Sequence, residues 1–411
     1  ARLLGVDPVE IRRRNLLTPD ELPHWTPAMM CLDSGRYGEL LDAVAARLDW
    51  PRVRAEAARE RAQGRLVGAG IASFVEATNF GPSLTAAMMG IANPGHDRAV
   101  VRMSATGELT VLTGQMPMGQ GLETALAQIA ADEIGVPLAQ VAVASGDTLA
   151  CPYTGYGSGG SRGAGVAGSA VMVAAQRLRE QLRRHAAHRF ALDDVALAAD
   201  AADAADGAFV APDGRRLEVA ELAAAAYLAA DLPPGVEPGL EAAYSYDPRA
   251  FAFSYGAVGA VVEIDRDSGA VAVRRLVFGH DCGPQLNPGL VRGQLVGAIA
   301  QAIGASFLEQ LPYAPDGQPL VRSLWDYFPP LPANVPAVEL LHLETPSPFS
   351  LNGAKGVGES GVIPVPAALA NAVRDALGAA DAVVDSLPMT AERVRAAVDR
   401  TSAARAAANP H

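Results

Sequence analysis

The stretch Gly353-Ala354-Lys355-Gly356-Val357-Gly358-Glu359-Ser360-Gly361 places four glycines and one acid within nine residues. Glycine is used where a backbone must take a positive φ or approach a ligand closely. A carboxylate on such a loop can act as a general base, because burial raises its pKa toward the working pH. We therefore interpret Glu359 as a candidate general base. The alternative is a glycine-rich turn with an exposed glutamate.

The composition is that of a globular protein. Half of the 411 residues are hydrophobic and 19% are charged, which allows a large core and two or more domains. The formal net charge of −12 argues against nucleic acids and anionic membranes as partners, since both attract basic surfaces. The longest apolar runs, at 164–175 and 295–308, are shorter than the ~20 residues that a membrane span needs. We therefore expect no membrane span.

The chain has three cysteines, Cys31, Cys151 and Cys282, and no CxxC pair. Zinc ribbons and iron–sulfur clusters need more cysteines at closer spacing, so we expect neither in this chain. A sparse and odd cysteine count is typical of a reducing compartment. We therefore expect a cytoplasmic location.

Hydrophobic periodicity and turn signals predict an α+β chain. We expect a buried strand at 66–73, a short strand at 141–144, hairpins at 98–113 and 255–278, and long helices at 122–134, 164–188 and 288–309. Pro233-Pro234-Gly235 is the best linker candidate. The expected division is a helical connecting segment (1–64), a first domain (65–235), a second domain that carries Glu359 (236–400), and a frayed tail (401–411).

Two familiar patterns occur within 155–163 without the context that each needs. The spacing Gly155-x-Gly157-x-x-Gly160 matches a dinucleotide-binding loop, but the residues before it make a poor strand and helix follows it. Gly159-x-Ser161-x-Gly163 matches a serine hydrolase elbow, whose His and Asp partners would have to be His280 and Asp281. These two are neighbours whose side chains diverge, so they form no relay.

His280, Asp281 and Cys282 do not predict a metal site. Consecutive residues on an extended segment alternate sides, so three in a row rarely bind one ion. We expect a polar turn with a buried cysteine.

Four glycine-marked loops remain, at 114–121, 155–163, 281–288 and 353–361. They offer backbone N–H groups, amides and hydroxyls, and at least two of them, 155–163 and 281–288, run into helix N-termini. Such loops can hold an anionic, hydrogen-bond-rich cofactor without large charges. We expect one large bound molecule shared by the loops, with Glu359 at its reactive end.

The order of these segments resembles the molybdenum-binding subunit of the xanthine dehydrogenase/aldehyde oxidase family. The likeness is closest to the large-subunit branch of aerobic carbon monoxide dehydrogenases and related bacterial hydroxylases. The blocks that carry it are DPVEIRRRNL (7–16), GQMPMGQGLET (114–124), GDT (146–148), PYTGYGSGGSR (152–162), DCGPQLNP (281–288), GQLVGAIAQ (293–301) and GAKGVGES (353–360). Together they cover nearly the whole chain.

The resemblance implies two mixed α/β molybdopterin-binding domains and a hydroxylase that inserts a water-derived oxygen at an electron-poor C–H of an aldehyde or N-heteroaromatic ring. The implied cofactor is a molybdopterin, in its cytosine dinucleotide form, that carries molybdenum. Glu359 is implied as the general base, and Gln120 as a glutamine that contacts the cofactor. The other implied contacts are Gly119, Gly121, Gly159, Gly160, Ser161, Arg162, Gln294, Lys355, Gly356, Val357 and Gly358. The molybdenum is held by the pterin and not by side chains.

The resemblance also implies partner chains. The family's subunit has a preceding half that carries further cofactor contacts and, in carbon monoxide dehydrogenases, a cysteine that bridges to copper. Since this chain starts without Met at Ala1, we expect another chain to supply that half. We expect a [2Fe–2S] subunit and an FAD subunit to take the electrons. Three alternatives stay open: a carbon monoxide dehydrogenase part, a cofactor-free scaffold subunit, and a serine hydrolase that uses Ser161.

Overall fold

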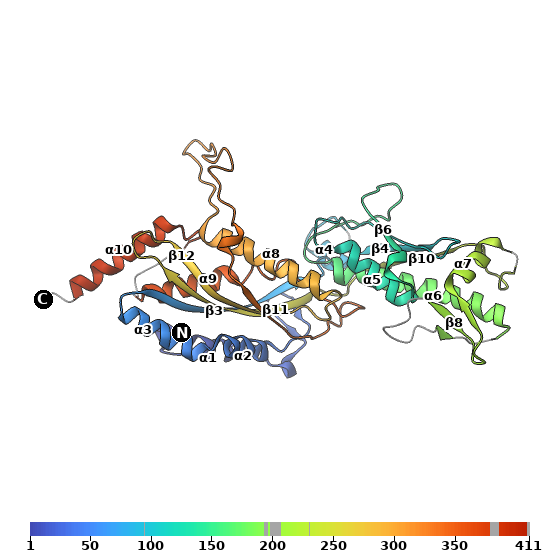
Figure 1. Cartoon of the computed structure of the whole chain (residues 1–411), viewed down its shortest axis with the longest axis horizontal. Coiled ribbons are helices and arrows are strands. Elements are labelled where there is room, and N and C mark those ends of the chain that lie inside the picture. Colours follow the sequence, from blue (N-terminus) through green and yellow to red (C-terminus); the bar gives the residue numbers. More distant parts are fainter. Residues whose placement is uncertain (94, 193–195, 198–206, 230, 379–385, 409–411) are drawn as a thin grey trace.

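The chain forms two lobes joined end to end (Figure 1). The computed structural model describes all residues except 94, 193–195, 198–206, 230, 379–385 and 409–411. Each lobe is built on a four-stranded sheet: β13-β12-β11-β3 in one, which we call the β11 lobe, and β10-β4-β5-β6 in the other, which we call the β4 lobe. In the part that the structure describes, no helix is both long and apolar enough to cross a bilayer.

The β11 lobe has helices on both faces of its sheet. Its strands are β3 (Leu66–Thr78), β11 (Ala252–Ile264), β12 (Val271–Asp281) and β13 (Val338–His342), of which only the β12–β13 pair is parallel. Alternate residues of these strands face two separate cores. One core packs on α1 (Pro8–Arg13), α2 (Tyr37–Leu48) and α3 (Trp50–Ala62). The other packs on α8 (Pro288–Phe307), α9 (Val365–Leu377) and α10 (Ala391–Ala408). The short strands β1 (His24–Trp25) and β2 (Cys31–Leu32) pair with each other.

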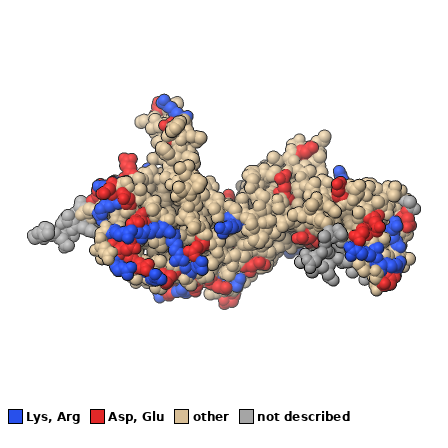
Figure 2. Space-filling view, in the orientation of Figure 1, with Lys and Arg blue, Asp and Glu red and all other residues tan. Residues whose placement is uncertain are grey.

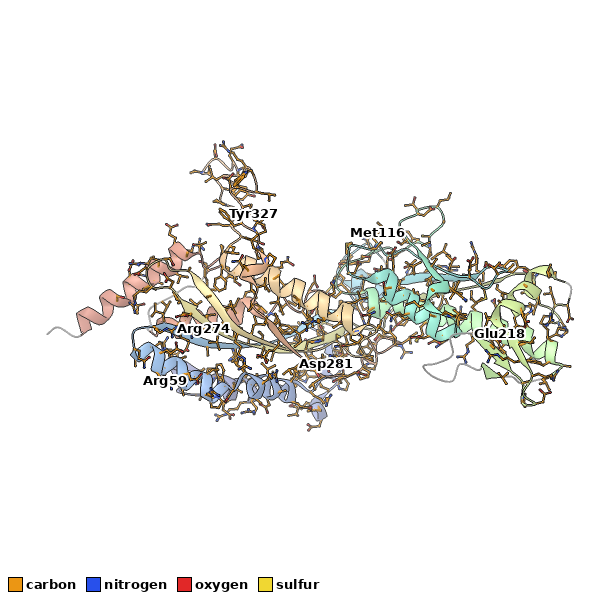
Figure 3. The ribbon with its side chains drawn as sticks, in the orientation of Figure 1. Arg59, Met116, Glu218, Arg274, Asp281 and Tyr327 are labelled. Carbon is orange, nitrogen blue, oxygen red and sulfur yellow. The ribbon has the colours of Figure 1, made fainter. Side chains whose placement is uncertain are left out.

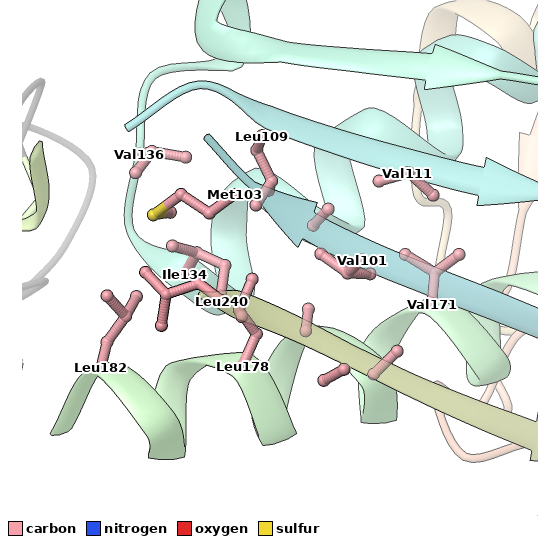
Figure 4. Close-up of a cluster of buried hydrophobic side chains, with 14 of the residues drawn as sticks. Val101, Met103, Leu109, Val111, Ile134, Val136, Val171, Leu178, Leu182 and Leu240 are labelled. Carbon is pink, nitrogen blue, oxygen red and sulfur yellow. The ribbon is translucent and has the colours of Figure 1, made fainter. Parts of the chain in front are cut away.

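The β4 lobe packs two helices on one sheet. Its strands are β10 (Leu240–Tyr246), β4 (Asp97–Met103), β5 (Leu109–Thr113) and β6 (Val141–Ala144). The helices α5 (Leu122–Ile134) and α6 (Gly168–Phe190) bury side chains such as Leu178 and Leu182 against Val101, Met103 and Leu240 (Figure 4). The lobe also contains α4 (Ser83–Met88), α7 (Val219–Leu228), a π-helical turn at Gly163–Ala167 and a 3-10 turn at Leu138–Gln140. A small sheet is formed by β7 (Ala196–Leu197), β8 (Ala208–Val210) and β9 (Arg216–Glu218).

The predicted α+β class is confirmed. The two predicted hairpins are β4–β5 and β11–β12. The helix predicted at 122–134 is α5, which ends at Gly135 with φ +80°. The frayed tail expected at 401–411 stays a prediction; α10 is described as far as Ala408, and Thr401 is buried. Charged side chains gather over α1–α3 and at the far end of the β4 lobe, while the region between the lobes is mostly uncharged on the face shown in Figure 2.

The two sheets exchange strands across the expected domain boundary near 235. β3 lies before this boundary but pairs with β11 along its whole length, from Leu66–Ile264 to Thr78–Ala252. β10 lies after the boundary but pairs with β4. A single cut in the sequence therefore does not separate the two sheets. The division at 65–235 and 236–400 stays a prediction for the cofactor-binding domains.

Helix α9 packs on β3 almost backbone to backbone. A Cβ on Gly70 would lie 2.1 Å from the carbonyl oxygen of Ala368 and 2.4 Å from the amide nitrogen of Ala372. A Cβ on Gly68 would meet α9 equally closely at Ala372 and Ala376. The close contact depends on the absence of side chains at these two positions, and it fixes β3 beneath α9.

The variant Gly70→Ala should push α9 away from β3. We expect it to lower the free energy of unfolding by roughly 1–3 kcal/mol, the usual cost of overpacking. Chemical denaturation followed by circular dichroism measures this. The control is Gly38→Ala in α2, where a Cβ would meet nothing within 4 Å. Equal stability of the two variants would contradict the packing account.

Candidate cofactor-binding site

The four glycine-marked loops meet around one cavity where the lobes join. The cavity has a volume of about 320 Å³. Figure 3 labels two of the loops, through Met116 on the β4 lobe and Asp281 at the end of β12. Of the predicted site residues, those that line the cavity are Gln120, Gly121, Gly159, Gly160, Ser161, Arg162, Gln294, Lys355, Gly356, Val357, Gly358 and Glu359. Gly119 is exposed and is not among the lining residues.

Loops 155–163 and 353–361 touch through their backbones. A Cβ on Gly356 would lie 2.2 Å from the carbonyl oxygen of Ser161 and 2.3 Å from its Cβ. Ser161 itself has φ +50°, a left-handed conformation that costs a non-glycine residue free energy. The amide of Gly356 donates a 3.0 Å hydrogen bond to Oγ1 of Thr78, at the end of β3. The glycines predicted that the backbone approaches a ligand closely. At Gly356 the close approach is a contact between two loops.

Hydrogen bonds tie the remaining loops to this pair. The amide of Lys355 donates to the carbonyl of Cys282 at 2.8 Å, which joins loop 353–361 to loop 281–288. The amide of Met116 donates to Oγ of Ser158 at 2.7 Å, which joins loop 114–121 to loop 155–163. Nδ2 of Asn79 donates to the carbonyl of Ala354 at 3.2 Å. The cavity wall is thus one connected network.

The side chain of Arg162 is fully buried, and its guanidinium binds the protein itself. Nη1 lies 3.4 Å from Oδ1 of Asp97 and donates to the carbonyl of Gly157 at 3.2 Å, and Nη2 donates to the carbonyl of Gly95. The guanidinium also lies over the ring of Tyr156, 5.4 Å from its centroid. Arg162 therefore shapes loop 155–163 through Nη1 and Nη2, while its buried Nε has no hydrogen-bond partner among the described residues.

Lys355 has a similar internal role. Its ammonium lies 3.6 Å from Oδ1 of Asp281, and the side chains of both residues are completely buried. The ammonium also sits over the ring of Tyr255, 5.1 Å from the centroid. Burial lowers the pKa of Lys355, and the carboxylate of Asp281 opposes that shift. The pair anchors loop 353–361 to the end of β12.

The two predicted glutamines lie at the cavity in different ways. The amide of Gln120 folds back on its own loop: Oε1 accepts from the amide of Met118 at 2.5 Å, and Nε2 donates to the carbonyl of Met116 at 3.0 Å. Gln294 projects from α8 toward Gly358, where a Cβ would lie 3.9 Å from its Oε1. Both glutamines line the cavity, and their contact with a cofactor stays a prediction.

Glu359 lines the cavity but is exposed in this chain. The burial that the sequence predicted for its carboxylate is therefore wrong for the described residues. Its Oε2 accepts a 3.4 Å hydrogen bond from Oγ of Ser161. The carboxylate thus faces the cavity next to loop 155–163, which is a suitable place for a proton acceptor.

Comparison with known proteins identifies the family. A family model described as the molybdopterin cofactor-binding domain matches residues 43–336, which is more than half of the chain. The chain belongs to the family of molybdopterin cofactor-binding domains. The resemblance that the sequence blocks indicated is confirmed at this level.

Three relatives illustrate how this molybdopterin cofactor-binding chain compares with longer proteins. It is 36% identical to the nicotine 6-hydroxylase large subunit of Paenarthrobacter nicotinovorans, with 96% of this chain and 48% of the relative covered. It is 35% identical to the carbon monoxide dehydrogenase large chain of Hydrogenophaga pseudoflava, with the same coverage. Its structure matches quinoline 2-oxidoreductase from Pseudomonas putida 86 with a TM-score of 0.88 and 37% identity, over 97% of this chain and 50% of the other. The chain thus spans about half the length of the relatives it matches.

The structure of this molybdopterin cofactor-binding chain adds one acid that sequence reasoning missed. Glu76 lies on β3, is 5% exposed, and accepts hydrogen bonds from three serines: Ser161 at 3.2 Å, Ser254 at 3.1 Å and Ser360 at 2.7 Å. Burial raises the pKa of Glu76 to about 7, which the three hydroxyls only partly oppose. The signal in the sequence was a lone acid within the apolar run Leu66–Thr78.

His280 and Cys282 do come together, with His342 of β13 as a third neighbour. Their potential ligand atoms lie within 4.8 Å of one another. Burial lowers the pKa of His280 to about 3, raises that of Cys282 to about 12 and lowers that of His342, so burial favours the uncharged form of all three groups. The buried ammonium of Lys355 acts on the same cysteine, and a cation there would repel a metal ion. The buried cysteine that the sequence predicted is confirmed at Cys282, whereas the absence of a metal site here stays a prediction.

The raised pKa of Glu76 predicts a pH dependence of stability. The folded chain holds a proton on Glu76 up to about pH 7, whereas the unfolded chain loses it near pH 4.5. The folded state therefore binds more protons in that window, and the free energy of unfolding falls as the pH rises through it. At about 1.36 kcal/mol per pKa unit, the loss is roughly 3 kcal/mol.

The variant Glu76→Gln should remove this loss. Urea denaturation at pH 4.5, 6 and 7.5 should show Glu76→Gln gaining stability relative to the wild type as the pH rises. The exposed Glu108 provides the matched control, Glu108→Gln. Parallel curves for the wild type and Glu76→Gln would show that the pKa of Glu76 is the same in the folded and unfolded chains, which would contradict the raised pKa.

Proposed function

We propose that this chain is the cofactor-binding part of the catalytic subunit of a molybdenum hydroxylase. The proposed reaction inserts a water-derived oxygen at an electron-poor C–H of an aldehyde or an N-heteroaromatic ring. The observation that carries the proposal is the cavity itself: four glycine-marked loops from both lobes close around it, and one carboxylate, Glu359, faces it. The family of the chain and the names of its relatives support this reading.

The cavity fits a molybdopterin. Its wall has bare backbone at Gly160, Gly356 and Gly358, and it has the amide of Gln294. The amides of Gln115 and Gln120 also line the wall but are bonded within the protein. Side chains on the first two glycines would collide with Phe80 and Ser161, so the loops depend on their absence. Backbone N–H groups and amides are suited to the hydrogen-bonding edges and phosphate of a pterin, and they bring no strong charge of their own.

When bound, the cofactor would supply two-electron redox chemistry and the oxygen atom to be transferred. The chain's own residues would position the reactants and move protons. Glu359 is proposed to accept the proton released as the oxygen attacks the substrate carbon. Loops 114–121 and 155–163, with Gln294, are proposed to hold the pterin. Arg162 and Lys355 are proposed to act indirectly, because their charges pair with Asp97 and Asp281.

Two relatives favour an N-heteroaromatic substrate over an aldehyde. The nicotine and quinoline enzymes are both named for ring nitrogen compounds, and they are 36% and 37% identical to this chain. Carbon next to a ring nitrogen is electron-poor and is open to attack by a nucleophilic oxygen. The proposed substrate class is therefore an N-heteroaromatic compound.

Carbon monoxide oxidation is the second candidate, favoured by the 35% identity to a carbon monoxide dehydrogenase large chain. Cys282 lines the cavity, but burial raises the pKa of its thiol to about 12. A thiol of such high pKa is a poor source of the thiolate that a soft metal ion needs. Cys282 therefore gives no support to a copper site in this chain.

The proposed partners are a chain or segment equivalent to the other half of the relatives, an iron–sulfur subunit and an FAD subunit. The chain's three cysteines are free, and no two of them form a CxxC pair. An arm between α8 and β13 projects from the β11 lobe (Figure 1) and exposes large apolar side chains, among them Leu324 and Trp325, which is 89% exposed. Exposed apolar surface of this kind is typical of protein interfaces.

The cytosine dinucleotide form of the cofactor and the cytoplasmic location of the chain are also proposals. The likeness to the carbon monoxide dehydrogenase branch supports the cytosine dinucleotide form of the pterin, which would release CMP on acid hydrolysis. The cytoplasmic location rests on the sparse cysteines.

The structure weakens the serine hydrolase alternative. Oγ of Ser161 contacts the carboxylates of Glu76 and Glu359, and no histidine is found among the described residues that line the cavity. A serine nucleophile needs a base that takes its proton and later returns it to the leaving group, usually a histidine. A cofactor-free scaffold remains the rival, and molybdenum content decides between it and the hydroxylase.

The variant Gly356→Ala should abolish cofactor binding. Its Cβ would force loop 353–361 away from Ser161 and open the cavity wall. We expect the molybdenum content of the purified complex, measured by elemental mass spectrometry, to fall to a small fraction of the wild-type value. Gly297→Ala on α8 is the control, because a Cβ there would meet nothing within 4 Å. Full molybdenum content in Gly356→Ala would contradict the placement of the cofactor.

The variant Glu359→Gln should separate binding from chemistry. We expect molybdenum content near that of the wild type, and turnover lower by at least about 100-fold, the usual contribution of a general base. Turnover is measured with nicotine, quinoline, benzaldehyde and carbon monoxide as probes, with Glu108→Gln as the control. Near-normal turnover in Glu359→Gln would exclude it as the base.

A further inference from the structure

The Ser161 hydroxyl lies between two carboxyl groups, and this arrangement sets a constraint on protons. Oγ of Ser161 lies 3.2 Å from Oε1 of Glu76 and 3.4 Å from Oε2 of Glu359. A serine hydroxyl carries one hydrogen, so it can donate to only one of them at a time. The second contact is favourable only if the other carboxyl is protonated and donates to Oγ. The arrangement is therefore best satisfied when the two glutamates share one proton.

The two oxygens of Glu76 have different surroundings. Oε2 accepts from Ser254 at 3.1 Å and from Ser360 at 2.7 Å, whereas Oε1 accepts only from Ser161 among the described residues. Oε1 is thus the position where a proton can reside and be donated back to Oγ of Ser161. Oε2 already accepts two hydrogen bonds, so Oε1 is the oxygen that exchanges the proton with Ser161.

We propose that Glu359, Ser161 and Glu76 form a proton relay, in which Glu76 takes up the proton that Glu359 accepts. The proton leaves Oε2 of Glu359 for Oγ of Ser161 as the hydroxyl proton of Ser161 passes to Oε1 of Glu76. Glu359 becomes a carboxylate again, and Glu76 becomes a neutral acid. The reverse transfer returns the proton when the cavity empties. Glu76 is thus a positioning residue, because it acts through Ser161 and Glu359. The proposal rests on the proposed role of Glu359.

The site meets the physical requirements of such a relay. Contacts of 3.2–3.4 Å are longer than a good O–H···O bond, but catalytic hydrogen bonds are often long before the reactants bind. A buried acid with no cation beside it among the described residues has a raised pKa, so Glu76 is ionised and able to take up a proton above about pH 7. The hydroxyls of Ser161, Ser254 and Ser360 face Glu76 from the elements packed against it, and Glu359 is the titratable group that acts on it.

The test is an infrared pH titration of the complex that contains this chain, with glutamate labelled by ¹³C at the side-chain carboxyl. The Glu76 band is assigned from the spectrum of Glu76→Gln. We expect Glu359→Gln to shift the midpoint of this band by about one pH unit or more, as for two coupled acids. The same substitution combined with Ser161→Ala should give a shift less than half as large.

The matched control is Ser254→Ala, which removes a hydroxyl from Glu76 without breaking the link to Glu359. In the Ser254→Ala background, Glu359→Gln should shift the midpoint of the Glu76 band by as much as it does in the wild type. An equal effect with and without the Ser161 hydroxyl would overturn the relay, and so would a Glu76 band that titrates below about pH 5, close to a free glutamate. If Glu76→Gln fails to fold, thermal unfolding shows it, and Glu76→Asp, which carries no label at this position, assigns the band so that the Ser161→Ala comparison still decides.

The titration distinguishes a failure of the proton relay from a failure of the proposed function. The titration reads carboxyl groups and needs neither substrate nor turnover. A complex without molybdenum would contradict the hydroxylase and leave the titration result standing. A molybdenum-loaded complex whose two glutamates titrate independently would contradict the relay alone.

Discussion

The contact between the backbones of Gly356 and Ser161 is the constraint on which the rest of the site depends. It joins a loop of the β11 lobe to a loop that opens the long helix of the β4 lobe, at a distance that leaves no room for a Cβ. Thr78 and Asn79, at the end of β3, fix the same loop through hydrogen bonds to Gly356 and Ala354. Because both lobes contribute walls, the cavity exists only while this contact holds.

Buried charge supports the same geometry in two different ways. Arg162 pairs with Asp97 and Lys355 with Asp281, so each cation that enters the interior meets an acid there. Loss of either partner of a buried pair leaves an uncompensated charge, which typically costs about 3–5 kcal/mol. Glu76 is different, because its hydrogen-bond partners among the described residues are hydroxyls. An acid in such surroundings is suited to exchanging a proton.

The sequence predicted the class, most of the elements and the four loops, because glycine spacing and hydrophobic periodicity are local signals. It could not predict which sheet β3 joins, since that pairing links Leu66–Thr78 with strand residues 174 to 198 positions away. For the same reason Glu76 could not be recognised from the sequence. The sequence suggested a buried carboxylate at Glu359, whereas Glu359 is exposed and the buried carboxyl group is that of Glu76. Arg162 and Lys355 suggested cofactor contacts, but the acids that hold their side chains inward lie 65 and 74 positions away in the sequence.

Anomalous diffraction from crystals of the native complex, collected on either side of the molybdenum absorption edge, tests the central claim most directly. The account predicts one anomalous peak for each copy of this chain, inside the cavity formed by loops 114–121, 155–163, 281–288 and 353–361, on the side of Glu359. A complex that diffracts well and shows no such peak, or shows it outside this cavity, would contradict the account.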